Sequence, residues 1–343
     1  MVSENNKRVV QIDILKGIGI IMLLVGHLLW QEGSSIVNFV NSFHMPLFFF
    51  ASGLLYKKRS LKETVYNKFF SLCLPLFLFS VLNLIPQIVF SLVKTEYNEQ
   101  LLTIFRFQGL WFLKVLLIVS LTYAFIDVLI DKINNRIKKI IVPVVISLLF
   151  IFGLLISYLS GIDGSSSFVI ALVGIGFYYV GVLSKRIVYL ITQLKYSWVL
   201  GLLGLGLMIG LFFLKTDSDV LMYCSSYGNL LFFLLKSFIG IVASTLIAFS
   251  IPKFWPLEFL GKNSLSIMLV HFPIYLSIEA LFSYLGKRTM LLQFPYSSLF
   301  ILVVLVVSSF IASFVNKFLP IFSGKWRMEE PADNLKRPAI DNN

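Results

Sequence analysis

The chain has 343 residues, of which 58% are hydrophobic and only 13% are charged. Too few polar side chains remain to cover a soluble domain of this size, so the composition excludes that class and predicts an integral membrane protein. The formal net charge is +12, but the basic residues are spread over the connecting segments and form no single patch, which argues against nucleic acid as a partner.

The apolar runs are long and continuous, which predicts helices, because a span in lipid must satisfy its own backbone hydrogen bonds. A span takes about 20 mostly apolar residues. The third predicted span is long, and Pro75 and Pro86 are expected to kink it, whereas the sixth is short. The ten predicted spans lie near residues 9–30, 36–56, 69–93, 110–130, 140–160, 168–184, 197–214, 228–250, 263–284 and 297–316.

The distribution of basic residues predicts the orientation of these spans. With the N-terminus in the cytoplasm, 21 of the 29 Lys and Arg residues fall on cytoplasmic segments and 5 on external loops. Cytoplasmic loops of membrane proteins carry such an excess. We therefore predict an all-α polytopic bundle with both termini in the cytoplasm, in which residues 1–323 form the transmembrane domain and residues 324–343 form a polar tail.

The first span carries three polar side chains that predict a site. Asp13 and Lys16 are three residues apart and share a face near the cytoplasmic end of the helix. His27 lies 11 residues beyond Lys16, roughly 16 Å along the axis, which is about one turn below the outer surface. The alternatives are an ion pair at the membrane interface for Asp13 and Lys16, and a polar residue in a packed bundle for His27.

His44 in the second span is expected at the same depth as His27, on a neighbouring antiparallel helix. Pro46 follows two residues later, frees a backbone carbonyl and bends the helix. An ionisable ring in lipid usually faces a protein interior or a water-filled path, and histidine exchanges protons near neutral pH. We therefore expect His27 and His44 to face one cavity. The alternative is a hydrogen bond from His44 to a loop.

These residues resemble a known family. Lys16-x10-His27, followed by SFHMPLFFFASG at residues 42–53, is similar to the membrane acyltransferase-3 family and, within it, to the fucose 4-O-acetylase-like branch. Such proteins have about ten spans and transfer acyl groups, usually acetyl, to sugar hydroxyls. Many members have arginine where this chain has Lys16, which keeps the charge but loses the bidentate fork.

Three later motifs extend the resemblance over residues 9–316. Lys68, followed by Leu74-Pro75, resembles the family's basic residue and LP pair on the third span. Trp111-Phe112-Leu113 resembles its WFL element. The stretch LGKNSLSIMLVH, which ends at His271, resembles its late stretch with glycine, serine and histidine.

The resemblance implies acyl transfer from a thioester to an alcohol. Such a reaction needs a base for the hydroxyl proton and a group that stabilises the developing oxyanion. His27 is the candidate base, and His44 is expected to orient the acceptor, relay the proton or polarise the carbonyl. Asp13 and Lys16 complete the predicted catalytic set. A covalent acyl-histidine intermediate is the alternative route.

The resemblance also implies acetyl-CoA as the acyl donor, with no permanently bound cofactor. Its phosphates would be held at the cytoplasmic mouth, where Lys68, Lys58 and Arg59 are the candidate ligands. The alternative for this cluster is that it only satisfies the charge rule for cytoplasmic loops.

Three further residues are candidates for substrate binding. Trp111, at the outer end of the fourth span, is expected to stack on a sugar ring or to anchor the helix at the interface. His271, which the span boundaries place near the middle of the membrane, is expected to line the path of the acyl group or to be a buried structural residue. Ser52, from the second motif, is expected in the substrate path.

The predicted function is therefore a membrane O-acetyltransferase, located in a bacterial plasma membrane, that moves acetyl from cytoplasmic acetyl-CoA to a sugar hydroxyl of an extracytoplasmic or lipid-linked polysaccharide. The alternative is a proton-coupled transporter or flippase of a sugar precursor, although the chain shows no internal repeat and its acidic residues lie mostly in loops. No metal is expected, because no Asp or Glu accompanies His27 and His44 at their depth.

Overall fold

The computed structural model describes residues 9–28, 35–82, 110–160, 166–194, 197–214, 220–285, 293 and 296–325. Over these residues the chain is helical, and its extended segments pair only in an isolated antiparallel bridge between Leu221 and Ser226. Seven described helices are long and apolar enough to cross a membrane. The predicted all-α membrane class is therefore confirmed.

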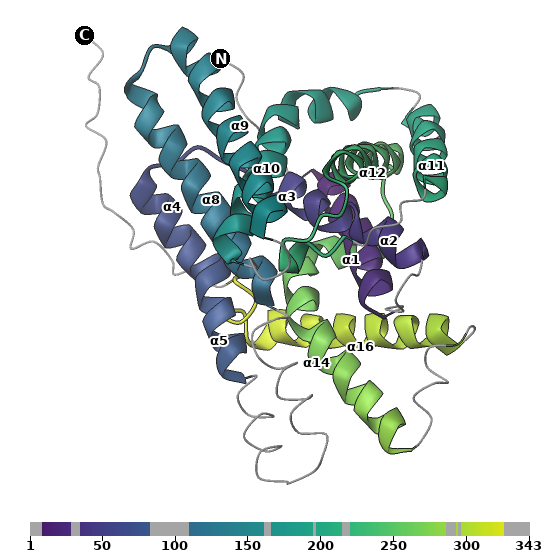
Figure 1. The fold of residues 1–343 in the computed structure, drawn as a ribbon. Helices are drawn as coiled ribbons and strands as arrows, with labels where there is room; N and C mark the ends of the chain where they lie inside the picture. Colours follow the sequence, from purple (N-terminus) through teal and green to yellow (C-terminus); the bar gives the residue numbers. More distant parts are fainter. Residues whose placement is uncertain are drawn as a thin grey trace, which may run out of the picture.

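The described helices follow the apolar runs of the sequence (Figure 1). In chain order they are α1 (Val10–Leu28), α2 (Ser35–Asn41), α3 (His44–Leu54), α4 (Leu61–Lys68), the π-helix η1 (Phe69–Cys73), α5 (Leu74–Leu82), α8 (Trp111–Leu129), the short 3₁₀ helix η3 (Ile130–Lys132), α9 (Asn135–Ser160), α10 (Ser167–Ile191), α11 (Ser197–Phe213), the 3₁₀ helix η5 (Met222–Cys224), α12 (Leu230–Ser250), α13 (Trp255–Lys262), α14 (Ser264–Tyr284) and α16 (Tyr296–Phe318).

Helix is present in each of the ten predicted segments, as far as these are described. Residues 83–93 of the third segment lie outside the described residues, as do residues 326–343 of the predicted tail. The number of helices that cross the bilayer and the side on which the termini lie stay predictions.

Three segments differ from the prediction. The second is broken into α2 and α3, and the sixth continues to Ile191 because Lys185 and Arg186 extend the helix beyond its apolar part. The third begins early, because Ser60 and Glu63 form a capping box in which each side chain bonds the other's backbone N–H at 3.2 Å.

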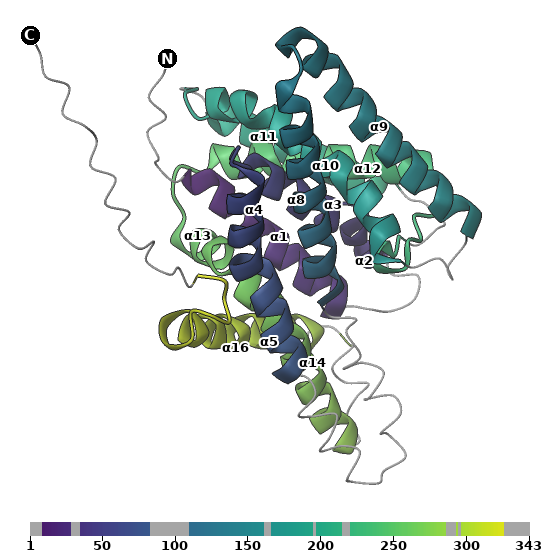
Figure 2. The ribbon, with the colours of Figure 1, turned by 90° about the vertical axis from the view of Figure 1, so that its left-hand side faces the viewer.

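Helix α1 lies in the interior of the body and contacts α2, α3, α12, α13, α14 and α16. Both views show it between α3 and α14 (Figures 1 and 2). Its Ile14, Leu15, Ile20 and Leu24 are fully buried. Lipid is as apolar as these side chains, so their close packing, more than burial from water, holds such a helix in place.

Small residues let neighbouring helices approach closely at two crossings. On α1, a Cβ at Gly17 would collide with the backbone of Leu257, and one at Gly261 would collide with the backbone of Asp13, so α1 and α13 touch directly. On α3, Gly53 faces the carbonyl of Tyr178 on α10 in the same way. Such contacts are typical of helix pairs in membranes.

Candidate active site

The break between α2 and α3 has a local cause in Pro46. Proline has no N–H, so the carbonyl four residues earlier, that of Ser42, receives no helical hydrogen bond. The hydroxyl of Ser237 on α12 donates to this carbonyl instead, at 2.7 Å. The break thus places His44 at the first position of α3, with a partner on α12 that replaces the missing bond.

Two glycines bring the start of α3 against its neighbours. A Cβ at Gly240 on α12 would collide with Cβ and Cγ of Phe43, and one at Gly26 on α1 would come within 2.9 Å of Asn41 Oδ1 and 3.9 Å of His44 Cε1. Phe43 itself is fully buried. His44 is therefore held over the end of α1, beside His27.

The three histidines of the chain form one cluster, the histidine centre (His27, His44 and His271). The ring centroid of His27 lies 6.5 Å from that of His44 and 5.5 Å from that of His271. His44 and His271 are 5% and 4% exposed, whereas His27 is only partly buried. His27 is thus the shared neighbour of the other two rings and the member that is accessible.

The position of His271 corrects the prediction that it lies at a deeper level. Helix α14 begins at Ser264, as the ninth predicted span does to within one residue, but it follows α13, a separate helix that packs along α1. Seven residues of α14 therefore carry His271 to the ring of His27. His271 joins the candidate catalytic pair.

Backbone hydrogen bonds set the tautomers of the two flanking rings. Nδ1 of His44 lies 2.9 Å from the carbonyl of Val40, and Nδ1 of His271 lies 3.1 Å from that of Ile267. A carbonyl only accepts, so each Nδ1 carries the proton, and in the neutral rings each Nε2 is an acceptor. Nε2 of His271 is buried and has no hydrogen-bond partner among the described residues.

Within the described part of the chain, no three His, Cys, Asp or Glu side chains are arranged as a metal site.

Asp13 and Lys16 form an ion pair with an N–O distance of 3.0 Å near the other end of α1. The Asp13 side chain is 4% exposed and that of Lys16 is 17% exposed. This is the local pair that their spacing predicts. It lies about three to four turns from His27 along the helix, so it is separate from the histidine centre.

Trp111 and Ser52 do not belong to the histidine centre. Trp111 begins α8, and its ring lies 6.0 Å from that of Phe112, which packs against Phe48 and Phe49 of α3. Ser52 is the ninth residue of α3 and His44 the first, a separation of roughly 12 Å along the axis. Their roles in substrate binding stay predictions.

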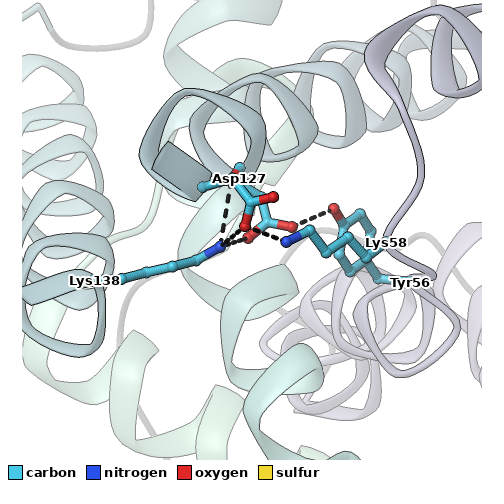
Figure 3. Close-up of polar contacts among 5 residues, drawn as sticks. Tyr56, Lys58, Asp127 and Lys138 are labelled. Carbon is cyan, nitrogen blue, oxygen red and sulfur yellow. Dashed lines mark hydrogen bonds and ion pairs between the residues drawn. The ribbon is translucent and has the colours of Figure 1, made fainter. Parts of the chain in front are cut away.

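A polar network that the sequence analysis did not predict joins four helices beyond the end of α3 (Figure 3). Tyr56 donates its hydroxyl proton to Asp127 of α8 at 2.9 Å. Lys138 of α9 lies 3.0 Å from both Asp127 and Asp131. Lys58 pairs with Asp131, and Lys185 of α10 donates to the carbonyl of Tyr56. The sequence signal for this network was an acidic residue in the last turn of an apolar span.

The network has clear electrostatic consequences outside the spans. Its hydrogen bonds to Lys58 and Lys138 hold the pKa of the Asp131 carboxyl below its usual range. Burial, with the hydrogen bond to Asp127, raises the pKa of Tyr56. In this structure Lys58 therefore anchors the loop after α3 to α8, and its predicted role in donor binding stays a prediction.

Arg59 and Lys68 present a different arrangement. The two cations are close enough to repel each other, Lys68 is half-buried at the end of α4, and the described residues provide neither with a carboxylate partner. The π-helix η1 follows Lys68 directly, and such bulges are frequent at functional sites. These two cations fit an anion better than Lys58 does.

The chain also matches the model of a known protein family. The family model described as an acyltransferase domain, acyltransferase-3, matches residues 9–315. The chain belongs to the acyltransferase-3 family. The match begins at α1 and ends in α16, so the whole histidine centre lies within this membrane acyltransferase domain. Comparison with curated proteins and with solved structures gave no significant match. The narrower fucose 4-O-acetylase-like branch stays a prediction.

Proposed function

We propose that this membrane acyltransferase is an O-acetyltransferase that uses cytoplasmic acetyl-CoA and acetylates a hydroxyl of an extracytoplasmic or lipid-linked polysaccharide sugar. The observation that carries the proposal is the convergence of His27, His44 and His271 from α1, α3 and α14, with His27 accessible between the other two. A base at a buried, partly accessible position is what transfer to an alcohol requires.

The donor side is supported by Arg59 and Lys68. Two repelling cations without a carboxylate partner among the described residues gain stability when an anion binds between them. Coenzyme A carries phosphates of that charge. Lys68 lies at the junction of α4 with the π-helix, and α4 follows the end of α3 that is away from His44.

The residues permit a direct transfer in which His27 moves one proton. Its imidazole takes the proton of the acceptor hydroxyl while the oxygen bonds to the thioester carbonyl carbon, and the carbonyl electrons move to oxygen. The tetrahedral intermediate then breaks its C–S bond, and the thiolate leaves with the proton from the His27 imidazolium. The products are an O-acetyl ester and free coenzyme A.

The tautomers of His44 and His271 limit the catalytic roles that these two rings can take. With Nδ1–H given to a backbone carbonyl, neutral His44 and His271 offer only Nε2 lone pairs to the centre. Polarising the thioester carbonyl requires a hydrogen-bond donor, and a lone pair only accepts. These two rings can therefore orient the acceptor or relay a proton, but they cannot polarise the carbonyl. Either ring can accept a hydrogen bond from an N–H of His27 or from the acceptor hydroxyl.

The test is the transfer of labelled acetyl from acetyl-CoA, in membranes that carry the protein, to the surface polysaccharide of its host. We expect wild type to form an alkali-labile O-acetyl ester and His27→Gln to be slower by about 10²–10⁴-fold in kcat, with the KM for acetyl-CoA nearly unchanged. Ser308→Ala, which alters a buried hydroxyl in α16, is the matched control and keeps full activity.

Full activity of correctly inserted His27→Gln would reject the catalytic role. The transporter alternative predicts a different result, namely movement of an unmodified sugar precursor across the membrane with no ester formed.

A further inference from the structure

A separate cavity lies between the end of α9 and the loop before α12. It has a volume of about 190 Å³, and seven residues line it. No charged side chain is among them, and five carry hydroxyl groups. The lining residues are Ser157, Tyr158, Ser225, Ser226, Tyr227, Gly228 and Leu230.

Two of these hydroxyls are buried and have no partner among the described residues. Ser225 is 2% exposed and Tyr227 is 3% exposed, and neither hydroxyl makes a hydrogen bond to the part of the chain that the structure describes. The hydroxyl of Ser157 lies near that of Tyr227 but outside hydrogen-bond geometry, and donates to the carbonyl of Gly153 at 2.8 Å. A buried polar group without a partner costs roughly 1–3 kcal/mol, so the cavity favours an occupant that both donates and accepts.

The backbone holds these hydroxyls in place. Ser225 has a left-handed φ of 57°, which is uncommon outside glycine, and Gly228 has the same φ. The bridge from Leu221 to Ser226 closes the loop, and the ring of Tyr227 lies 4.6 Å from that of Phe233 on α12. The position of both hydroxyls is thus fixed before any ligand arrives.

Helix α12 connects this cavity to the histidine centre. Phe233, which contacts Tyr227, lies one turn before Ser237, whose hydroxyl bonds the carbonyl of Ser42 at the start of α3. The loop before α12 and helix α2 lie on the same side of the body in Figure 2. The cavity is therefore near the histidine centre but lies outside it.

We infer that this cavity is a carbohydrate subsite that binds a neutral sugar unit of the acceptor other than the unit being acylated. The inference rests on the proposed function. Hydroxyls that donate and accept match those of a sugar, the seven described lining residues carry no charge that would attract an anion, and Tyr158, which is 71% exposed, can stack its ring on the apolar face of a pyranose. The volume is below the roughly 300–1,000 Å³ of drug-sized sites, which suits one ring. The acceptor would then have at least two sugar units.

Saturation-transfer NMR on the protein in lipid nanodiscs tests this subsite. The probes are the methyl glycosides of glucose, galactose, N-acetylglucosamine and fucose. At least one should give a signal with wild type, and Tyr227→Phe should weaken that signal by about threefold or more, since one hydrogen bond is lost. Ser225→Ala combined with Tyr227→Phe should reduce it to background.

Two control variants and the acetyl-transfer assay distinguish failure of the subsite from failure of the proposed function. Ser308→Ala removes a buried, unpartnered hydroxyl that does not line the cavity, so it should bind like wild type. Gly210→Ala should also bind glycoside normally, because nothing lies within 4 Å of its Cβ. If binding survives while acetyl transfer fails in wild type, the proposed function is wrong and the subsite stands.

Two results would overturn the subsite. The first is the absence of any glycoside signal with wild type, which would mean that the cavity holds water only. The second is an equal signal from wild type and from the double variant, which would mean that sugars bind elsewhere.

Discussion

Pro46 shows how one residue sets a position at the candidate site. Its missing N–H frees the carbonyl of Ser42, which the hydroxyl of Ser237 then satisfies across 195 residues of sequence. The sequence predicted the freed carbonyl and the shared depth of His27 and His44. It could not predict the partner on α12, because a hydrogen bond over such a separation depends on how the helices pack. His271 was misplaced for the same reason, since its depth relative to His27 depends on how α13 and α14 pack against α1.

Also at the residue scale, an experiment can distinguish the contributions of Lys68 and Lys62, both on α4, to binding of the donor. Lys68→Ala should raise the KM for acetyl-CoA by about 10-fold or more, because a hydrogen bond to a charged group contributes roughly 1.5–3 kcal/mol. Lys62→Ala is the matched control, because this lysine is exposed on the same helix. Steady-state kinetics at two salt concentrations would check both. Equal KM values for the two variants would remove Lys68 from the donor site.

At the scale of elements, the break before α3 depends on the close approach of α12. Gly240→Ala would place a methyl group against Cβ and Cγ of Phe43, closer than real contacts allow, which should destabilise the fold by about 1–3 kcal/mol. Because His44 follows Phe43 directly, kcat should also fall by about 10²-fold. Gly210→Ala is the control, since nothing lies within 4 Å of its Cβ. Thermal unfolding in detergent and transfer kinetics would show whether α12 positions His44; an active, stable Gly240→Ala protein would refute it.

The polar network at the C-terminal end of α8 makes a prediction about how stability depends on pH. The pKa of Asp131 is lower in the folded protein than in the unfolded chain, because Lys58 and Lys138 bond its carboxylate. Its stabilising effect is therefore complete above about pH 4, the unfolded-state pKa, and is lost as pH falls toward the folded-state pKa. Unfolding temperatures of wild type between pH 3 and 7 should drop at the acidic end by more than those of Asp131→Asn. Parallel curves would show that the pair contributes nothing.

For the whole molecule, the sequence predicted the helical class and the segments well, because the apolar runs of a membrane protein fix its helices directly. Polar contacts between helices were predicted poorly. Tyr56 and Asp127 are 71 residues apart, and only packing brings them together. Likewise, Lys58 belonged to the predicted donor cluster, but in the structure it pairs with Asp131. The sequence did not predict where Asp131 lies in the fold.

The predicted orientation of the spans in the membrane can be checked by labelling. Lys62→Cys and Tyr158→Cys, each made with Cys73 and Cys224 replaced by alanine, place a thiol at an exposed position at the start of α4 and at another in the last turn of α9. A maleimide that does not cross membranes should reach the first only from the cytoplasmic side and the second only from outside. Labelling of both from one side would contradict the predicted orientation.

The most direct measurement is a double-mutant cycle between His27 and His271 in the acetyl-transfer assay. If the rings act as one centre, His27→Gln combined with His271→Gln should be no slower than His27→Gln alone, because groups that act as a unit are not additive. A kcat reduced by the product of the two single effects would mean that the rings act independently, and it would contradict the shared histidine centre.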